Sequence, residues 1–467
     1  MNKSVLIVTP YFAPQSHAAV FRAHKLAKYL PRFGWKPHVL TVATNYLYNE
    51  DAALRSDLPP EVVVSTTKYI EPTMRGVRMA LGGRDRTFNA QKDVGAVNIN
   101  ESLSSTRTCA RSLARSAYQY VRESWLSSPD AHWTWYRFAV REARRIINTE
   151  GIPLVYTSCL PFTSNRIGLT LQHEGVRWVA DFRDPPAYSI RMSSPVDRVY
   201  MKQRRIERDT LQQADAVTTT SSAYEMIFRD MHGPNIRDTF HFIPTGLDDD
   251  YIGEPNAGHA MQQTYIVFAG EYLAEYGDTF LQIFARALDD PELRQLGIRL
   301  LVIGRREVNV PLIRPILARL GITESVEFRD HVRQPELYAI LRSARAGLLI
   351  PGPTSHWWTN FAKMVDYIAL RLPCLALVPD PSEARSQLSK AGLGVFLDGD
   401  RDTAAQTLIN FLLGHSRELT PNSAECDRYL ASTQVQSFVN VFESLIHESA
   451  QPDNVNPAGR SNFHRRS

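Results

Sequence analysis

The sequence predicts an α/β protein built from two doubly wound parallel sheets. Short runs rich in β-branched and aromatic residues alternate with segments of helical periodicity, the pattern of repeated strand–helix–strand units. The alternation occurs twice, once on each side of a stretch at 251–263 that is rich in Gly, Pro, Asn and Gln. The chain has 467 residues, more than one hydrophobic core normally supports, so two domains are expected.

The N-terminal domain is predicted to span 1–255. Its strands are short runs of high β propensity. They are Val5–Thr9, His38–Val42, Leu154–Ser158, Trp178–Asp181, Ala216–Thr220 and Phe240–Pro244. Apolar residues recur at helical spacing between these runs. The predicted helices include Ala19–Leu30, Ser164–His173 and Arg198–Gln213.

An Arg-rich segment at about 71–128 interrupts this rhythm. Its part at 82–100 has the composition of a flexible loop, and Arg107–Leu126 has the periodicity of a helix with arginines towards one side. The helix is a candidate for peripheral membrane contact or acceptor binding. Alternatively it is a solvated helix packed on the domain, because basic faces are common on surface helices.

The second domain is predicted to span 262–425. Its strands are Tyr265–Ala269, Leu300–Ile303, Val326–Phe328, Gly347–Ile350, Cys374–Val378 and Gly394–Leu397. Its helices include Thr279–Ala287, Pro311–Leu320, Gln334–Ala344 and Asn360–Leu372. A last helix at Val435–Glu448 belongs to a C-terminal segment at 426–450, and the polar tail 451–467 is expected to be disordered.

Composition and missing motifs exclude several classes of function. The net charge of +4, with no basic block interleaved with aromatics, argues against nucleic-acid binding. The four cysteines are widely spaced and form no CxxC pair, which suits a reducing cytoplasm. No apolar run has the length of a signal peptide core or a membrane span. Dinucleotide-binding, Walker, zinc-protease and serine-hydrolase motifs are absent from the sequence.

Candidate ligand-binding residues follow the strands, since ligands of open α/β sheets bind at the carboxyl ends of strands. In the second domain Gly304 permits close approach of a ligand, and Arg305 or Arg306 is suited to a diphosphate, unless they are a surface arginine pair. Lys363 and Asp366 are three residues apart on one face of a predicted helix. They are suited to a phosphate and a sugar, or they form a plain surface ion pair.

Two further groups follow strands of the first domain. Ser16 and His17 come after the first strand, where His17 is either a polar donor to a substrate or an incidental loop residue. Asp181, Arg183 and Asp184 come at the end of the fourth strand. One carboxylate is a candidate for binding or deprotonating an acceptor hydroxyl, and an arginine–aspartate structural clamp is the alternative.

Several of these segments resemble GT-B glycosyltransferases of the family 4-like group. The donor-site helix of that group carries Lys-x-x-Glu-Tyr followed by Pro, which stand here as Lys363, Asp366, Tyr367 and Pro373. The opening SVLIVTPYFAPQSHAAVFR and the segments VADFRDPPA, ADAVTTTSS and IPTGLDDDY resemble further parts of that group in the same order. The resemblance covers most of Ser4–Asp398.

The resemblance implies two facing Rossmann-like domains with a cleft between them. It implies transfer of a sugar from a nucleoside diphosphate to a saccharide or lipid-linked acceptor, with retention, in surface polysaccharide or glycan biosynthesis at the cytoplasmic face of the membrane. The implied catalytic residues are Lys363, Asp366, Arg305 and Asp184. The implied donor-binding residues are Gly270, Gly304, Arg306 and Tyr367. The implied acceptor-binding residues are Ser16, His17 and Arg183. No metal or other cofactor is expected.

Besides Asp366 for the usual glutamate and Pro186 for a usual aromatic residue, the chain departs from the group at three places. Ser16 and His17 replace a usual glycine pair, Glu271 stands where a basic residue is common, and Trp358 stands where an acid is expected. His356 and the indoles of Trp357 and Trp358 are candidate substitutes for that acid, because tryptophans stack on sugars or bases, although paired tryptophans are also common in cores. Two alternatives therefore stay open: an inactive binding subunit and a sugar-nucleotide epimerase.

Overall fold

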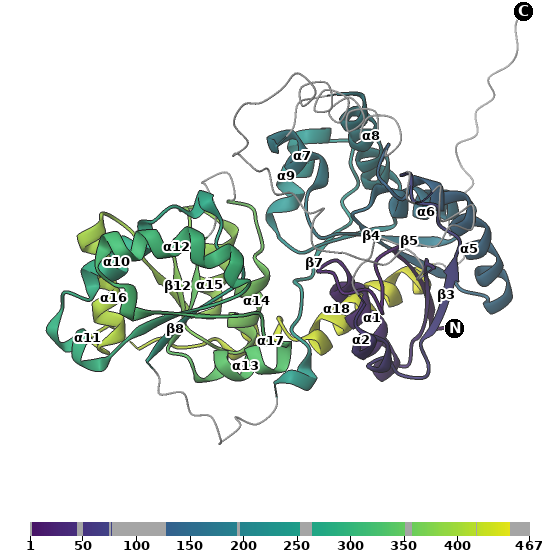
Figure 1. The fold of residues 1–467 in the computed structure, drawn as a ribbon. Coiled ribbons are helices and arrows are strands. Elements are labelled where there is room, and N and C mark those ends of the chain that lie inside the picture. Colours follow the sequence, from purple (N-terminus) through teal and green to yellow (C-terminus); the bar gives the residue numbers. More distant parts are fainter. Residues whose placement is uncertain are drawn as a thin grey trace, which may run out of the picture.

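A computed structural model describes residues 2–43, 50–73, 76, 128–193, 197–252, 264–350, 357–416 and 418–448. These residues form two α/β domains, each built on one parallel sheet (Figure 1). The two-domain, doubly wound fold class predicted from the sequence is confirmed. Most of the Arg-rich segment, most of the linker and the tail lie outside the described residues, so the predictions about them stay predictions.

The N-terminal sheet has seven strands in the order β3-β2-β1-β4-β5-β6-β7. The strands are β1 Ser4–Val8, β2 Lys36–Val42, β3 Val63–Thr67, β4 Leu154–Cys159, β5 Arg177–Phe182, β6 Ala216–Thr219 and β7 Phe240–Phe242. The helices around it are α1 Val20–Tyr29, α2 Ala52–Ser56, α5 Tyr136–Glu150, α6 Phe162–Gln172, α7 Pro186–Ser193, α8 Arg198–Gln213 and α9 Ala223–His232. Strand β3 was not predicted, because it is an edge strand with largely exposed side chains and lacks a buried apolar run.

The C-terminal sheet has six strands in the order β10-β9-β8-β11-β12-β13. The strands are β8 Tyr265–Ala269, β9 Arg299–Ile303, β10 Val326–Arg329, β11 Ala346–Leu349, β12 Cys374–Ala376 and β13 Gly394–Phe396. The helices are α10 Thr279–Ala287, α11 Pro291–Leu296, α12 Arg306–Leu320, α13 Gln334–Ser343, α14 Ala362–Ala369, α15 Glu383–Ala391, α16 Arg401–Leu412 and α17 Ser423–Asp427.

Two helices of this domain differ from their predicted bounds. Helix α12 starts at Arg306, five residues before its predicted start, and contains Pro311 and Pro315. Both prolines are exposed, so carbonyl groups left without a helical partner are open to water. Helix α14 ends at Ala369 and not at Leu372, because the chain reverses at Arg371, whose φ is +52°.

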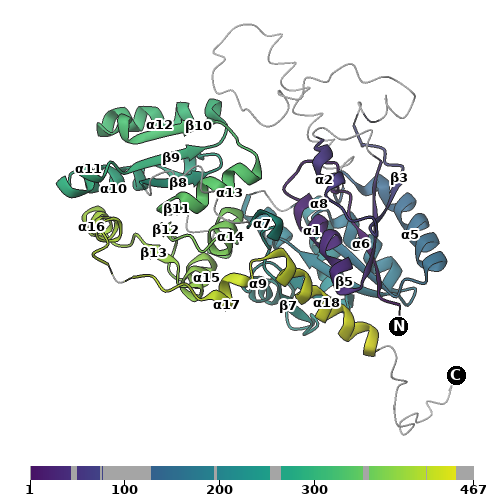
Figure 2. The same cartoon turned by 90° about the horizontal axis from the view of Figure 1, so that it is seen from below.

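The last helix, α18 (Ala431–Glu448), leaves the C-terminal domain and packs on the N-terminal one. Its side chains Phe438 and Phe442 pack with Tyr156 and Trp35 of the N-terminal domain. Figures 1 and 2 show this helix in yellow, lying along α1. Within the described residues, no helix combines the length and the apolar character needed to cross a bilayer.

The carboxyl edge of the N-terminal sheet faces the first turns of α14 and α15. The side-chain amide of Asn360 donates to the carbonyl of Thr220, directly after β6, at 2.7 Å. The N–H of Ser222, at the start of α9, donates to the carboxylate of Glu383 at 3.1 Å. A carboxylate at a helix N-terminus is favourable, so this contact helps to hold the two domains together. Helix α14 therefore lies at the junction of the domains, as both views show (Figures 1 and 2).

Candidate functional site

Lys363 lies in the first turn of α14, close to the end of strand β8. Its Nζ is 3.8 Å from the centroid of the Phe268 ring. A Cβ placed on Gly270 would lie 3.7 Å from the same atom. Burial lowers the pKa of Lys363 to about 8, since a low-polarity environment disfavours the charged amine. The ammonium, the glycine backbone and the N–H groups of the helix N-terminus together form an anion-binding arrangement.

Gly270 and Gly304 meet at the carboxyl ends of β8 and β9. Gly270 has a φ of +125°, which favours glycine, and its N–H donates to the carbonyl of Ile303 at 2.8 Å. A Cβ on Gly304 would come within 2.3 Å of the Gly270 carbonyl oxygen, so this close approach requires glycine. The amide of Asn309 donates to that carbonyl at 3.0 Å and accepts from the N–H of Tyr272 at 2.7 Å. These contacts fix two strand ends beside Lys363 while the Gly270 backbone stays exposed.

The two arginines that follow β9 have different surroundings. Arg305 is the N-cap residue of α12, and its Nε donates to Glu271 Oε1 at 2.5 Å. Glu271 thus offsets the charge of Arg305, the residue expected to bind phosphate. Arg306 is exposed in the first turn of α12. Arg305 must leave Glu271, or share its guanidinium with it, before it contacts a diphosphate.

Asp366 makes no ion pair with Lys363 in the described part of the chain, and it lies close to a charged group of the N-terminal domain. The hydroxyl of Tyr338 donates to Asp366 Oδ1 at 3.4 Å. The ammonium of Lys25, on α1, is close enough to act on the pKa of Asp366. Burial raises the pKa of Asp366 to about 7, while Lys25 and the tyrosine hydroxyl oppose the rise. Lys25 donates to the carbonyl of Gly246 at 2.6 Å, so its ammonium is held at the domain boundary. The structure therefore brings together Asp366 and Lys25, a pair that the sequence reasoning missed.

The prediction that Tyr367 contacts the donor needs correction. Its side chain is fully buried, and its hydroxyl lies within 3.4 Å of the carbonyl oxygens of Val267 and Leu348. A Cβ on Gly347 would lie 2.6 Å from the tyrosine ring, so the ring packs directly against strand β11. Tyr367 anchors α14 to the sheet and does not face a ligand.

On the N-terminal side, Asp181 is a structural acid. Arg22 of α1 contacts both carboxylate oxygens of Asp181 at 2.8–3.1 Å, and Thr218 donates to Oδ1 at 2.6 Å. Both Arg22 and Asp181 are buried, at 2% and 0% exposure. An arginine–aspartate clamp does exist, as one of the two alternatives expected, but Arg22 and not Arg183 supplies the arginine.

Arg183 and Asp184 follow β5 at the sheet edge. Arg183 donates through Nη2 to the carbonyl of Leu160 at 3.1 Å, and its Nε is buried without a hydrogen-bond partner. Asp184 reaches solvent. The surrounding protein raises the pKa of its carboxyl, and Arg183 opposes the rise. Asp184 is thus a carboxylate at the edge that faces the second domain.

An aromatic cluster, which we define as Tyr11, His17, Tyr69 and His132, lies at the same edge. Tyr11 stacks on His17 at a centroid distance of 5.1 Å and meets His132 edge-on at 5.2 Å, and His132 stacks on Tyr69 at 5.2 Å. His17 Nδ1 accepts from the N–H of Ala19 at 3.1 Å, so the proton of the neutral ring is on Nε2. Burial lowers the pKa of both histidines, and the charge of Arg183 lowers that of His17 further.

Asp130 holds the backbone next to this cluster through hydrogen bonds. Its carboxylate accepts from the N–H of His132 at 2.8 Å and from the N–H and hydroxyl of Thr163, also at 2.8 Å. Ser16 is exposed on the loop beside His17. Of the cluster, only His17 was predicted from the sequence. The segment DAHWTWY, which supplies Asp130 and His132, carries the signal that was missed: acidic, imidazole and indole side chains placed closely together.

Trp358 does not take the place of the missing acid. Its indole packs into the N-terminal core, 5.9 Å from the ring of Tyr188 and 6.0 Å from that of Tyr224. Its carbonyl accepts from the hydroxyl of Ser221 at 3.2 Å. Trp357 is partly buried against the same core, and His356 lies outside the described residues. Of the two alternatives, core packing holds for Trp358, because the side chain is 7% exposed and fills an interdomain contact.

In the described part of the chain, no three His, Cys, Asp or Glu side chains gather closely enough to hold a metal ion.

No protein-family model and no curated protein matches this chain. Solved structures do match it. Sucrose-phosphate synthase from Thermosynechococcus elongatus aligns over 96% of this chain and 100% of its own, with a TM-score of 0.60 and 13% identity.

The chain has the GT-B fold. The α,α-trehalose 6-phosphate synthase from Burkholderia multivorans aligns over 99% of this chain and 100% of its own, at a TM-score of 0.56 and 12% identity. HepE from Anabaena, solved with UDP, aligns over 95% of this chain and 100% of its own, at a TM-score of 0.55 and 13% identity. At such identities the likeness concerns the GT-B fold alone, so the activity has to be argued from the residues of this chain.

Proposed function

We propose that this GT-B protein is a glycosyltransferase that moves a sugar from a nucleoside diphosphate to a hydroxyl of a saccharide or lipid-linked acceptor. The observation that carries the proposal is the position of Lys363. It lies in the first turn of α14, next to the exposed Gly270 backbone, at the junction of the domains. A half-buried ammonium beside a helix N-terminus is a strong partner for a diphosphate.

In the proposed reaction, Lys363 and Arg305 stabilise the negative charge that develops on the departing diphosphate. The bond between the anomeric carbon and the phosphate oxygen breaks, the acceptor oxygen bonds to that carbon, and the proton of the acceptor hydroxyl passes to the Asp184 carboxylate. Fixed positive groups at the place where charge develops are an effective source of rate enhancement, and they replace a metal ion here. Gly270 and Gly304 let the phosphates approach the backbone, Arg306 adds a second guanidinium, and Asp366 binds hydroxyls of the ribose or the sugar.

The acceptor would bind to the N-terminal half of the site. Asp184 and the Nε2–H of His17 are suited to orient its hydroxyl, with Arg183 and Ser16 beside them. The aromatic cluster adds flat apolar faces, which sugars bind through their C–H surfaces. Retention of the anomeric configuration, a role in surface polysaccharide or glycan biosynthesis and a cytoplasmic location are parts of the proposal that rest on the resemblance.

The proposal is tested by measuring transfer with and without an acceptor. Purified protein is incubated with sugar nucleotides and a panel of saccharide acceptors, and the products are analysed by NMR for the new glycosidic bond and its anomeric form. Lys363→Gln is expected to lose transfer, whereas Lys390→Gln, an exposed lysine on α15, keeps it. Conversion of the sugar nucleotide without any acceptor would instead indicate an epimerase. Nucleotide binding without any conversion would indicate an inactive binding subunit.

A further inference from the structure

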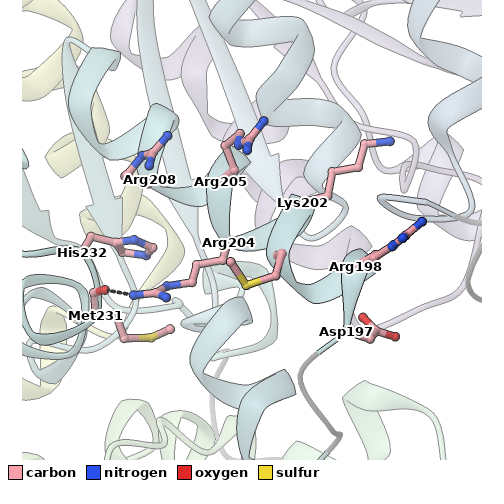
Figure 3. A pocket seen from close by; sticks show the side chains of 9 residues that line it. Asp197, Arg198, Lys202, Arg204, Arg205, Arg208, Met231 and His232 are labelled. Atoms are coloured by element: carbon pink, nitrogen blue, oxygen red, sulfur yellow. Dashed lines mark hydrogen bonds between the residues drawn. The ribbon is translucent and has the colours of Figure 1, made fainter.

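A basic groove lies on the N-terminal domain, between α8 and the end of α9 (Figure 3). It has a volume of about 630 Å³ and contains none of the residues of the candidate site. Its cationic side chains all come from helix α8. They are Arg198, Lys202, Arg204, Arg205 and Arg208. Figure 3 shows Arg204 reaching the carbonyl of Met231, while the other cationic side chains extend away from it.

The acidic groups near the groove already have partners. Asp197 caps α8 by accepting from the N–H of Tyr200 at 2.8 Å. Glu207 is fully buried and binds the ring of His232 at 2.7 Å and the N–H of Ala187 at 3.0 Å. Glu207 is thus turned to the core, whereas Asp197 lines the groove but makes no ion pair with its cations in the described part of the chain.

Four of the five cations make no ion pair with any carboxylate in the described part of the chain. Arg208 pairs with Asp209 at 2.8 Å, and Arg204 donates to the carbonyl of Met231. Besides Arg204, the cations without an ion pair in that part of the chain are Arg198, Lys202 and Arg205, and all three are exposed. Other surface arginines do pair with acids. Examples are Arg144 with Glu174, Arg229 with Glu225 and Arg319 with Asp278.

The spacing of these three residues puts their charges on one side of α8. Arg198 and Arg205 are seven residues apart, or two helical turns, and Lys202 lies between them at four and three residues. Like charges at such spacing repel one another, so an anion placed between them relieves the repulsion. Met201, 52% exposed, lines the same groove and adds apolar surface.

We propose that this groove binds the phosphate group of a phosphate ester or diphosphate, as a second anion site apart from the donor cleft. The guanidinium fork of arginine matches two phosphate oxygens, and the lysine adds a point charge between the two forks. Met201 suits a ligand with an apolar part next to its phosphate. The phosphate belongs either to a lipid headgroup or to a soluble molecule, and both sources present the same chemistry to the groove.

Lys202 links the groove to the acceptor half of the site. Its ammonium donates to the carbonyl of Ser128 at 3.2 Å, two residues before Asp130. Its neighbour Gln203 donates to the carbonyl of Pro129 at 2.7 Å. The groove therefore borders the segment that positions His132, although its occupant does not depend on the proposed sugar transfer.

The test compares two double variants of the full chain with the same change in charge. Arg198→Gln with Arg205→Gln removes two groove cations, and Arg137→Gln with Arg141→Gln removes two exposed arginines four residues apart on α5. Inorganic pyrophosphate binding is measured by calorimetry, and vesicle binding by flotation with phosphatidylglycerol and with phosphatidylcholine. Pyrophosphate binding in the donor cleft contributes equally to all three proteins, because none of the four arginines lies there. Thermal unfolding checks that each variant is folded.

The groove variant is expected to bind pyrophosphate or phosphatidylglycerol vesicles at least about tenfold more weakly than the wild type, while the α5 variant is unchanged. A loss seen with pyrophosphate identifies a soluble ligand, and a loss seen only with phosphatidylglycerol identifies a lipid. Equal binding by the groove variant and the wild type in both assays overturns the proposal. Equal losses in both variants, or no binding by the wild type, overturn it too. Arg205→Gln alone, with a smaller loss, keeps the test decisive if the double variant is unstable.

Discussion

Lys363 provides the sharpest prediction, because its pKa of about 8 places its charge change within an accessible pH range. In the unliganded protein, the charged fraction of this amine falls from roughly nine-tenths at pH 7 to roughly one-tenth at pH 9. A bound diphosphate favours the ammonium and raises its pKa, so the complex keeps the charge over the same range. Binding above pH 8 must therefore take up a proton. The affinity for a nucleoside diphosphate is expected to fall about tenfold between pH 7 and pH 9.

The assay is calorimetric titration of the tightest-binding nucleoside diphosphate at pH 7, 8 and 9. Lys363→Arg is the matched control, because a guanidinium stays charged at all three pH values and removes the pH dependence of the affinity. Lys363→Met is expected to bind weakly at every pH. The reasoning is refuted if the wild-type affinity is the same at pH 7 and pH 9. It is equally refuted if Lys363→Arg shows the wild-type fall, since another group would then be titrating.

Three further predictions follow from the contacts around the site. Asp366 has a pKa raised from 3.8 to about 7, so the native state binds this proton more tightly than the unfolded state, and stability is lost as pH rises from about 4 to 7. Asp366→Asn should therefore raise the melting temperature at pH 8 and leave it unchanged at pH 4, with a gain of at most roughly 4 kcal/mol; no gain at pH 8 would refute the burial argument. Glu271→Gln should release Arg305 and tighten nucleoside diphosphate binding about threefold in calorimetry, a gain that Arg305→Gln should abolish. Trp358→Ala should cost roughly 3–5 kcal/mol in urea unfolding, and Trp358→Phe less; a change below roughly 1 kcal/mol for the alanine variant would contradict the interdomain packing.

The strands could be predicted well where they are buried on both faces. In the second domain the predicted run Tyr265–Ala269 coincides with β8, and the other five runs overlap their strands. Parallel strands covered by helices are continuous apolar runs, which makes them visible in a sequence. Edge strand β3, with exposed side chains in VVSTT, offers no such run. The end of α14 depends on the reversal at Arg371, which has a positive φ although it is not a glycine, so its residue type does not predict the turn.

The candidate site could be predicted in part, for a geometrical reason. Gly270, Gly304 and Lys363 follow strands or begin a helix at the carboxyl edge of one sheet, so the topology alone brings them together. The prediction for Tyr367 was wrong, because its side chain turns into the core. The proximity of Asp366 to Lys25 of the other domain could not be predicted from helical spacing either.

Contacts between distant parts of the chain explain what the sequence did not reveal. Asn309 joins the ends of β8 and β9 through hydrogen bonds to Gly270 and Tyr272. Trp358 crosses from one domain into the core of the other. Such contacts depend on how helices and domains pack, and a periodicity of 2 or 3.6 residues contains no information about that packing.

The measurement that tests the central claim most directly is a mass-spectrometric donor screen. Wild-type protein and Lys363→Ala are incubated side by side with UDP-, GDP-, ADP- and dTDP-sugars in the presence of saccharide acceptors, and donor loss and nucleotide release are measured. The account predicts that the wild type consumes one class of donor and releases its nucleoside diphosphate, whereas Lys363→Ala leaves the donor intact. Equal consumption of a donor by both proteins would contradict the assignment of Lys363 to a donor site. The same assignment would be contradicted if every donor stayed intact and none of them shifted the melting temperature of the wild-type protein.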